Sequence, residues 1–500
     1  MSDYASVIHL ENEAATLLLA EDIALALAAG DCLTLSGDLG AGKSTLARGI
    51  IRSIAGDDRL EVPSPTFTLV QSYDLRVPVS HFDLYRLGSA DELDELGLDE
   101  FLESGAALVE WPERADGTLP GDAVSLVLTG SGAGRDLEIS GAGPFVDRFL
   151  RSRAARAFLE ENGHSGARRR FLQGDASSRS YERIGDGGLI LMNAPRKPDG
   201  PPVRDGLPYS RIAHLAEDVK PFVAIDRLLR GWGFAAPRIP AAAMDDGFLL
   251  VENLGSGTPL DDNRDPIPER YVAAIDFLAA LHAKGVPGPI TLPDEESYEV
   301  PPYDRRALGI EVELLTDWYL PYKTGEDVDG KVRDDYIARW QGLFDELKKA
   351  PKALVLRDFH SPNIIWRPDE SGLDRVGLID FQDALIGPAT YDVASLVQDA
   401  RVTVPDTLAK MLLARYEERR LMADAGFDPD AFRRYYAIMA AQRAAKILGI
   451  FVRLDRRDGK PAYLKHLPRI EAYMARSLEH PALEPLRSWF ASAGIAAVDS

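Results

Sequence analysis

A glycine-rich segment near the N-terminus, Gly37–Ser44, restricts the fold of this chain more than any other feature. It reads GDLGAGKS and matches the pattern G-x-x-x-x-G-K-[ST] at every fixed position. A short apolar run at residues 32–35 precedes it and is typical of a buried strand, and residues 44–55 read as a helix. In such a unit the glycines let several backbone N–H groups point at one anion, and the helix N-terminus adds its positive dipole end. The pattern therefore predicts a phosphate-binding loop in an α/β domain.

Two side chains of this loop have predicted roles at a nucleotide. Lys43 reaches the β- and γ-phosphates as a point charge, and the Ser44 hydroxyl binds Mg²⁺. A chance glycine-rich turn is the alternative, and such a match becomes rare once a flanking strand and helix are also required. The nucleotide-binding candidates within the loop are Gly37, Gly40, Ala41, Gly42, Lys43 and Ser44.

Two acidic residues end predicted strands downstream of the loop. Residues 79–85 lead to Asp83, and an acid at the end of a strand beside a phosphate loop is where Mg²⁺ takes a carboxylate. The apolar residues 106–109 lead to Glu110, which either orients an attacking water or only caps a turn. Prolines in the segment 62–70 predict an extended loop, and its Thr66 hydroxyl either senses a γ-phosphate or belongs to a simple turn.

Composition narrows the class of protein. At 500 residues the chain is long enough for more than one domain. The formal net charge of -22 argues against a broad basic surface for direct nucleic-acid binding. The single cysteine, Cys32, permits no intrachain disulfide bond. No basic region precedes an apolar stretch at the N-terminus, and Glu21 and Asp22 interrupt the first apolar segment, so we expect a cytoplasmic protein without a membrane partner.

Four motifs of the first third, taken in order, resemble one family. They are GDLGAGKST, SPTFTL, HFDLYR and LVEWPE. Together they resemble the TsaE family of small P-loop ATPases, which are needed to make threonylcarbamoyladenosine in tRNA, and the resemblance covers roughly residues 5–142. It implies that a TsaB–TsaD-type tRNA modification complex is the partner. The residues that it places at ATP and Mg²⁺ are Lys43, Ser44, Thr45, Thr66 in a switch loop, Asp83 on the metal, and Glu110 with Trp111 near the γ-phosphate.

A glycine-rich junction separates the two halves of the chain. The alternating runs 124–128 and 137–140 predict a hairpin that closes the first domain, and Gly143-Pro144 follows it. Residues 147–161 read as a helix. We therefore expect an N-terminal domain at residues 1–143, a helical connector at 144–163, and a second domain at 164–500.

The second half carries the residues expected for phosphoryl transfer. Asp358 is followed five residues later by Asn363, and a strand, a turn and a second strand then lead to Asp380. This arrangement is typical of the protein-kinase-like fold, in which Asp358 would accept the proton of a substrate hydroxyl while Asn363 and Asp380 hold Mg²⁺ on the phosphates. Asp392, at the start of the next helix, either stabilises the catalytic loop or is an ordinary helix-start acid.

This half resembles the aminoglycoside phosphotransferase family over roughly residues 165–480. The segments QGDASSRSYERI, LILMNAP, FLLVENLG and LRDFHSPNIIW are most similar to the AmgK-like members, which phosphorylate the anomeric hydroxyl of N-acetylmuramate and N-acetylglucosamine in cell-wall recycling. The resemblance implies an α+β bilobal protein-kinase-like fold behind the α/β P-loop NTPase domain, with ATP and Mg²⁺ as cofactors and an amino sugar as substrate. The strand FLLVE leads to the expected hinge, where Val251 and Asn253 are nucleotide-binding candidates.

Two positions depart from the family pattern. Leu356 stands where a histidine is frequent, and the strand that usually carries an ATP-binding lysine reads Leu191-Met192-Asn193. Our hypothesis is that Arg179 or Arg183 supplies the missing positive charge. The segments between residues 303 and 345, with Glu311, Glu313, Trp318 and Tyr319, are expected to line the sugar pocket, although the same residues suit a core or a surface equally well.

Three functions remain compatible with the second half. It is a sugar kinase, a kinase for another small hydroxyl substrate of the aminoglycoside, homoserine or choline type, or a regulatory pseudokinase that docks partners. The complete set of Asp358, Asn363 and Asp380 argues against the last of these, because a scaffold has no use for all three. The sequence thus predicts a bifunctional protein with an ATPase and a phosphotransferase.

Overall fold

The protein is described from a computed structural model that covers residues 4–88, 92, 95–115, 117–174 and 179–492. The chain divides into two compact units. Unit 1 comprises Met1–Pro195 and Ala241–Val251, and unit 2 comprises Arg196–Pro240 and Glu252–Ser500. Each unit has its own hydrophobic core, so the two are described separately. Among the described residues, no helix combines the length and the apolar character that crossing a bilayer requires.

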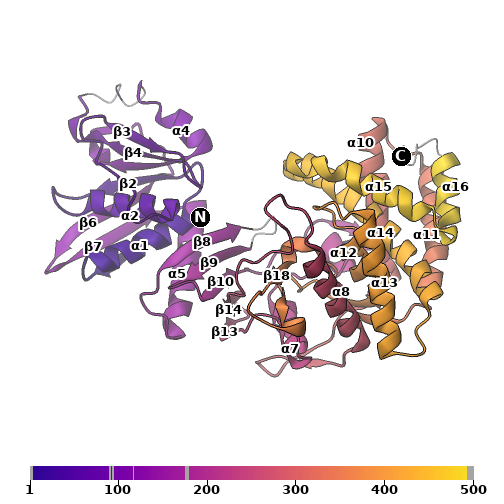
Figure 1. Ribbon diagram of the computed structural model, residues 1–500. Coiled ribbons are helices and arrows are strands. Elements are labelled where there is room, and N and C mark those ends of the chain that lie inside the picture. Colours follow the sequence, from indigo (N-terminus) through magenta and orange to yellow (C-terminus); the bar gives the residue numbers. More distant parts are fainter. Residues whose placement is uncertain (1–3, 89–91, 93–94, 116, 175–178, 493–500) are drawn as a thin grey trace. The chain divides into compact units, whose positions relative to one another are not determined.

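A mixed seven-stranded sheet forms the first part of unit 1 (Figure 1), with the strand order β1-β7-β6-β2-β5-β4-β3. Strand β2 pairs in parallel with β5 and β6, and β5 pairs in parallel with β4. The carboxyl ends of β2, β5 and β4 therefore meet at one edge of the sheet. The strands are β1 (Tyr4–Leu10), β2 (Cys32–Ser36), β3 (Val70–Tyr73), β4 (Val79–Asp83), β5 (Ala106–Glu110), β6 (Val124–Ser131) and β7 (Gly134–Gly141).

Helices lie against both faces of this sheet. Apolar side chains of α1, α2 and α5 share one core with β2 and β6, and a second cluster joins α4 to β4 and β5. Helix α1 begins where the Asn12 side chain accepts the N–H of Ala15, and α2 ends at Gly56, whose φ of 67° suits a glycine. The helical segments are α1 (Glu13–Ala26), α2 (Lys43–Ala55), α4 (Leu98–Ser104), α5 (Pro144–Glu161), and the short 3₁₀ turns Leu84–Arg86 and Pro112–Ala115.

A second, five-stranded sheet completes unit 1, in the order β13-β14-β10-β9-β8. Helix α5 covers one face of it, because Ala155, Phe158 and Leu159 pack against apolar residues of β9, β10 and β14. The same helix also packs on α1, so α5 belongs to the cores of both sheets. The strands are β8 (Arg169–Gly174), β9 (Ser180–Ile184), β10 (Leu189–Asn193), β13 (Ala241–Ala243) and β14 (Phe248–Glu252).

Unit 2 is mainly helical, with four short two-stranded sheets. Its strands are β11 (Pro202–Arg204), β12 (Leu207–Pro208), β15 (Ile290–Thr291), β16 (Ser297–Tyr298), β17 (Lys352–Val355), β18 (Ile364–Trp366), β19 (Val376–Leu378) and β20 (Leu385–Pro388). Its α-helices are α6 (Tyr209–Ile212), α7 (Lys220–Gly231), α8 (Pro268–Ala283), α9 (Arg305–Leu314), α10 (Leu320–Thr324), α11 (Gly330–Leu347), α12 (Thr390–Val397), α13 (Asp406–Ala423), α14 (Pro429–Asp458), α15 (Leu467–Leu478) and α16 (Glu484–Ser492). A π-helical turn, Leu315–Tyr319, joins α9 to α10, and 3₁₀ turns occur at Ser361–Asn363, Gly372–Arg375, Pro461–His466 and Pro481–Leu483.

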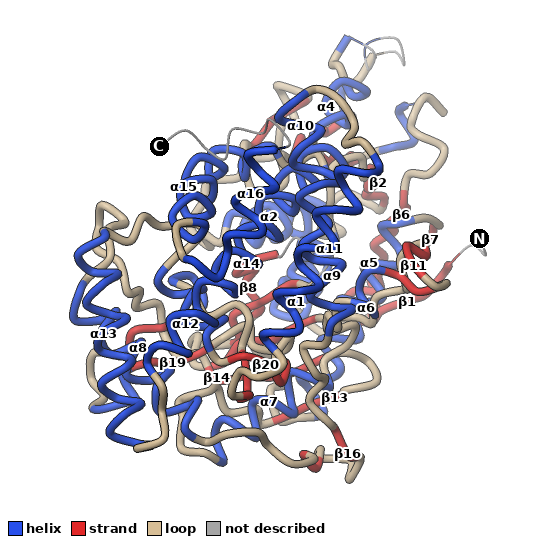
Figure 2. Tube along the Cα trace, turned by 90° about the vertical axis from the view of Figure 1, so that its right-hand side faces the viewer, coloured by secondary structure: helices blue, strands red, loops and turns tan. Residues whose placement is uncertain are grey.

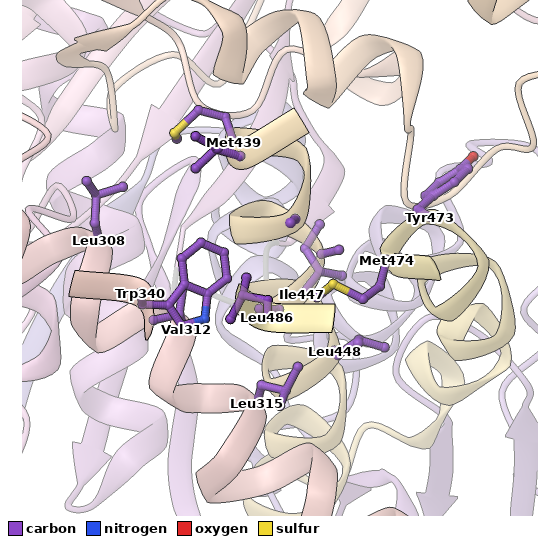
Figure 3. Packing of buried hydrophobic residues seen from close by; sticks show 14 of the residues in the cluster. Leu308, Val312, Leu315, Trp340, Met439, Ile447, Leu448, Tyr473, Met474 and Leu486 are labelled. Atoms are coloured by element: carbon purple, nitrogen blue, oxygen red, sulfur yellow. The ribbon is translucent and has the colours of Figure 1, made fainter. Parts of the chain in front are cut away.

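The core of unit 2 surrounds α14, the long helix of 30 residues. Trp340 of α11, Val312 of α9 and Leu448 of α14 meet there (Figure 3). Helices α9 and α11 run side by side next to this core (Figure 2). Gly449 allows α14 to approach α9, since a Cβ atom at that position would lie 2.2 Å from the carbonyl oxygen of Leu314. This close packing fixes the helices that lie behind the catalytic loop.

Local sequence patterns did not predict several strands, among them β1, β8 and the short strands β11, β12, β13, β15, β16 and β20. Strands β1 and β8 are recognised only through their partners, because β1 pairs with β7 and β8 pairs with β9. The acidic segment 93–102 also reads as a helix from its sequence; residues 98–102 of it belong to α4, and residues 93–94 lie outside the described part of the chain. The sequence also predicts a small-residue turn at the start of the segment 175–184, and residues 175–178 of this segment lie outside the described part of the chain as well.

Two candidate nucleotide sites

The phosphate-loop motif folds as a compact turn between β2 and α2. Gly37, Gly40 and Gly42 have φ angles of 138°, 80° and 112°, a region that side chains disfavour. At Gly37 a Cβ atom would also lie 2.3 Å from the carbonyl oxygen of Leu128, so no larger residue fits there. The Lys43 ammonium donates to the carbonyl oxygens of Gly37, at 2.6 Å, and Asp38, at 3.1 Å. The loop therefore curls around the position of the lysine.

Lys43 has a further contact that the motif alone does not predict. Its ammonium lies 3.7 Å from the ring centroid of Trp111, which directly follows β5. Trp111 has a φ of 60°, an unusual value for a residue with a side chain. Its ring also packs against Tyr85, with 5.0 Å between the ring centroids. The cation–π contact holds the lysine beside the loop and brings Trp111 to the same place.

The two strand-end acids are direct neighbours, because Asp83 and Glu110 are register partners in the parallel pair β4–β5. Glu110 accepts a hydrogen bond from the Ser44 hydroxyl at 3.0 Å. Asp83 instead accepts hydrogen bonds from Ser64, at 3.0 Å, and Thr66, at 2.9 Å. One acid is thus attached to the phosphate loop and the other to the proline-containing loop.

A cavity of about 290 Å³ opens between these groups. Most of the site residues predicted from the sequence of this half line the cavity. Its lining residues are Leu39, Gly40, Gly42, Lys43, Ser44, Thr45, Ser64, Thr66, Asp83, Tyr85, Glu110 and Trp111. Ala41 lines an adjacent cavity of about 230 Å³ on the other side of the loop, beside Asn12 and Arg135. Hydroxyl and carboxylate oxygens are the ligands that Mg²⁺ prefers, so Ser44 and Asp83, which both line this cavity, are donors that fit this ion.

In unit 2 the catalytic-loop motif lies between β17 and β18. The Asn363 side-chain amide donates to the Asp358 carbonyl oxygen at 2.9 Å and to Asp380 Oδ2 at 3.2 Å. Gln382 donates to the other carboxylate oxygen of Asp380 at 2.8 Å. The structure therefore brings Asp358, Asn363 and Asp380 together. Since both N–H groups of Asn363 are engaged, its Oδ1 atom and the Asp380 carboxylate form an oxygen pair that fits Mg²⁺.

The buried carboxylate of Asp392 stabilises this loop through hydrogen bonds to its backbone. Asp392 accepts hydrogen bonds from the backbone N–H groups of Leu356, at 2.7 Å, and Arg357, at 2.9 Å. This confirms the stabilising alternative for Asp392. Arg357 and Asp380 have φ angles of 70° and 60°, so the backbone is held in a left-handed conformation on both sides of the site. Strained backbone of this kind persists only where the surroundings fix it, and it is frequent at active sites.

The charge of Asp358 is stabilised by its surroundings. Burial alone would raise the pKa of Asp358, but His360, Lys446 and Arg357 together lower it below its usual value. Burial also lowers the pKa of His360, which therefore loses its charge more readily. At neutral pH, Lys446 and Arg357 are accordingly the cations that keep Asp358 ionised and able to accept a proton.

The remaining nucleotide candidates of this half are divided between the two units. Arg183 is exposed on β9, on the face opposite that of Glu182 and Ile184, and Arg179 directly precedes this strand. Val251 is buried at the end of unit 1. Asn253 belongs to unit 2, where its side chain accepts the Gly255 N–H at 3.0 Å.

Sequence reasoning missed several residues of both sites. His81 is 1 % exposed, and its Nε2 atom lies 2.9 Å from Glu110 Oε1. The signal was available, because His81 and Asp83 are two residues apart on a strand and share a face. No comparable spacing in the sequence pointed to Gln382, which contacts Asp380. Among the expected sugar-pocket residues, Glu311, Glu313 and Tyr319 are 0 %, 4 % and 4 % exposed, which favours the core alternative for all three.

Comparison with known proteins identifies both halves. Residues 10–137 match the model of the family described as threonylcarbamoyl adenosine biosynthesis protein TsaE. Residues 168–435 match the model of the phosphotransferase enzyme family. The second match alone spans more than half of the chain.

Individual relatives agree with these matches. The chain is 34% identical over 358 residues to the N-acetylmuramate/N-acetylglucosamine kinase of Caulobacter vibrioides, covering 68% of this chain and 96% of the relative. The kinase of the same name from Pseudomonas aeruginosa is 35% identical over 331 residues, covering 64% of this chain and 86% of the relative. The TsaE protein of Rickettsia felis is 43% identical over 105 residues, covering 21% of this chain and 61% of the relative. The chain thus belongs to the phosphotransferase enzyme family, and it carries a TsaE-family P-loop domain at its N-terminal end.

Proposed function

We propose that this chain has two activities. Its second half transfers the γ-phosphoryl group of ATP to the anomeric hydroxyl of N-acetylmuramate and N-acetylglucosamine, and its first half hydrolyses ATP in support of threonylcarbamoyladenosine formation in tRNA. The observation that carries the kinase proposal is the contact of Asn363 with both Asp358 and Asp380. The names of the relatives support the choice of substrate.

In the kinase step, Asp358 accepts the proton of the sugar hydroxyl while the hydroxyl oxygen attacks the γ-phosphorus. The bond from this phosphorus to the bridging oxygen breaks, and ADP leaves with the electron pair. Asn363 and Asp380 would hold Mg²⁺, which neutralises the charge of the phosphates when it is bound. Lys446 and Arg357 keep Asp358 in the ionised form that this proton transfer needs.

In the ATPase step, the backbone N–H groups of the loop and Lys43 would bind the phosphates. Ser44 and Asp83 are the proposed Mg²⁺ ligands, and Glu110 is proposed to orient the attacking water. The contacts of Glu110 with Ser44 and His81 support this role, because they fix the carboxylate at the phosphate end of the cavity. Membership of the TsaE family supports a TsaB–TsaD-type complex as the partner and the cytoplasm as the location.

Three variants, one in the second half and two in the first, test both activities in the full chain. Asp358→Asn is expected to lower sugar phosphorylation by at least about 100-fold, because the base is lost, while ATP hydrolysis at the P-loop persists. Lys43→Ala and Glu110→Gln are expected to do the reverse. Product formation is measured by NMR of the phosphorylated sugar, and hydrolysis by phosphate release without sugar. Loss of both activities in any one of the three variants would contradict two separate sites.

The charge that replaces the usual ATP-binding lysine is a further part of this proposal. Arg179 or Arg183 is proposed to contact the phosphates, and Arg183 is the stronger candidate because it is exposed on β9. Arg179→Ala with Arg183→Ala is expected to raise the KM for ATP in the kinase assay by about 10-fold or more, as loss of a charge-assisted hydrogen bond does. Arg196→Ala, outside the strands, serves as the control. An unchanged KM for ATP in the double variant would exclude both arginines.

A further inference from the structure

A buried carboxylate lies behind the catalytic loop of unit 2, on a helix that the proposed reaction does not use. Glu311 of α9 is 0 % exposed. It accepts hydrogen bonds from the Tyr303 hydroxyl, from Arg357 and, at 2.8 Å, from Gln442. The Lys446 ammonium lies 2.9 Å from the carboxylate oxygen that also receives Arg357. Glu311 thus ties α9, α14 and the catalytic loop to one another.

The residue that Glu311 binds is the direct neighbour of the proposed base. Arg357 precedes Asp358 and has a φ of 70°, which costs of order 1–3 kcal/mol for a residue with a side chain. Its guanidinium donates to the Ala213 carbonyl oxygen at 2.9 Å as well as to Glu311. Its backbone N–H is bound by Asp392. The side chain and the main chain of Arg357 are therefore both anchored, which keeps the unfavourable conformation in place.

The position of the Asp358 side chain is set mainly through its own backbone. Its hydrogen bonds to the described residues use the main chain, whose carbonyl oxygen accepts from Asn363 at 2.9 Å and from His360 at 2.8 Å. The direction of its carboxylate consequently depends on the backbone conformation at residues 357 and 358. A displacement of about 1 Å at such a group can cost about 100-fold in rate.

The charges around Glu311 are balanced only while it is ionised. Burial would raise the pKa of Glu311, but Lys446 and Arg357 lower it to about 2, so the group is a carboxylate throughout the physiological range. Without this negative charge, two buried cations would remain close together with no partner between them. Repulsion would then move Arg357, whose position is coupled to Asp358 through one peptide bond.

We propose that Glu311 is a positioning residue for phosphoryl transfer: by anchoring Arg357 and Lys446 it holds the Asp358 carboxylate in the orientation that accepts the proton of the sugar hydroxyl. This inference rests on the proposed kinase function. It assigns to α9 a role in turnover, and it explains why a charged cluster is buried beneath the loop.

The test compares two neighbouring buried glutamates in the full chain. Glu311→Gln keeps the shape of the side chain and removes its charge, and it is expected to lower kcat by at least about 10-fold with the KM values for sugar and ATP within about 2-fold. Glu313→Gln is the matched control. Glu313 lies on the same helix, is 4 % exposed and pairs with Arg204 and Arg333, but it does not contact the catalytic loop. Its variant is expected to keep kcat.

Hydrogen exchange provides a readout that does not depend on the identity of the substrate. The Arg357 amide is expected to exchange faster in Glu311→Gln than in Glu313→Gln. If Glu311→Gln does not fold, Tyr303→Phe decides, because it removes one hydrogen bond to Glu311 without a change in charge and should lower kcat severalfold at constant KM. Equal kcat and exchange in the two glutamate variants, or a change in KM alone, would overturn the proposal. Failure of the wild-type protein to phosphorylate an amino sugar would instead overturn the proposed function, and the exchange comparison would still decide the role of Glu311.

Discussion

Two buried carboxylates of unit 2 show how much the partners of an ionisable side chain matter. Glu311 is surrounded by donors, and burial, which would raise its pKa, is outweighed by Lys446 and Arg357. Asp226 of α7 is equally inaccessible, with a side chain 1 % exposed, but its nearest cation, Arg230, is 3.9 Å away. Its other oxygen has no hydrogen-bond partner among the described residues. Burial therefore raises the pKa of Asp226 to about 7.

This difference predicts a pH dependence of stability. In the unfolded chain Asp226 has an ordinary pKa near 3.8, so the folded state retains its proton over a range in which the unfolded state has lost it. The free energy of unfolding should consequently fall as the pH rises from about 4 to about 7, and it should then stay constant. Asp226→Asn removes this dependence. Relative to the wild type, the variant is expected to gain about 2 kcal/mol between pH 5.5 and pH 8.

The measurement is urea unfolding of both proteins at these two pH values. Asp334→Asn on α11 serves as the control, because Asp334 is exposed and its replacement should shift stability equally at both values. A difference between wild type and Asp226→Asn that does not change with pH would show that Asp226 is ionised in the folded protein.

At the scale of elements, α5 carries the connection between the two sheets of unit 1. One side of it packs on the five-stranded sheet, and the other side faces α1. Charged side chains, most of them buried, reinforce this contact. We call them the junction cluster, which consists of Glu21 and Asp22 of α1, Arg153 and Arg156 of α5, Arg168, Arg169 of β8, and Glu182 of β9. The acids that interrupt the apolar pattern of α1 therefore have a structural purpose.

Asp22 is the central member of the junction cluster. It is 0 % exposed and receives Arg156 at 2.7 Å, Arg153 at 2.8 Å and Arg169 at 2.8 Å. Asp22→Asn removes the charge that these three cations share, so that Arg156 keeps only Glu21 and Arg169 only Glu182. Removal of one partner from a buried ion pair costs about 3–5 kcal/mol. We expect a loss of this size in denaturant unfolding, with faster hydrogen exchange in β8.

Asp58 provides the matched control for this prediction. It pairs with Arg168 and Arg170, but its side chain is 49 % exposed. Asp58→Asn should therefore cost less than about 1 kcal/mol, as exposed ion pairs do. Equal effects of the two substitutions would mean that the junction cluster does not stabilise the contact between α1 and α5.

At the scale of the whole chain, the compact units do not coincide with the sequence motifs. The motifs separate two enzymes near residue 143, whereas unit 1 continues to Pro195 and takes up Ala241–Val251. The reason is physical: the five-stranded sheet has an apolar face, and α5 is the helix that covers it. An uncovered sheet of this kind exposes a contiguous apolar patch.

The residue at which a shortened chain begins should accordingly decide whether that chain stays soluble and phosphorylates the sugar. A chain that starts at residue 144 keeps α5 and is expected to retain sugar phosphorylation, with a lower melting temperature because the acids of α1 are lost. A chain that starts at residue 164 lacks Ala155, Phe158 and Leu159, and it is expected to aggregate or lose activity. Melting temperature, solubility and turnover are compared with those of the full chain. Equal behaviour of the two shortened chains would contradict a structural role for α5.

The sequence by itself was enough to predict those parts of the two sites whose functional residues lie close together in one short segment. The phosphate loop, the contact of Asp358 with Asn363, and the carboxylates at the ends of β4 and β5 follow from local spacing, because strand and turn geometry fix distances over a few residues. Both family memberships rest on such segments.

The tertiary structure decided which distant residues complete these sites. Trp111 meets Lys43 across 68 positions, Glu110 meets His81 from a neighbouring strand, and Glu311 of helix α9 reaches Arg357 of the catalytic loop. The pairing of β1 with β7 and the burial of Asp22 against Arg169 are likewise invisible in a local pattern. A buried charge and an edge strand are stable only with the partners that folding brings to them, and for this physical reason the local sequence could not predict them.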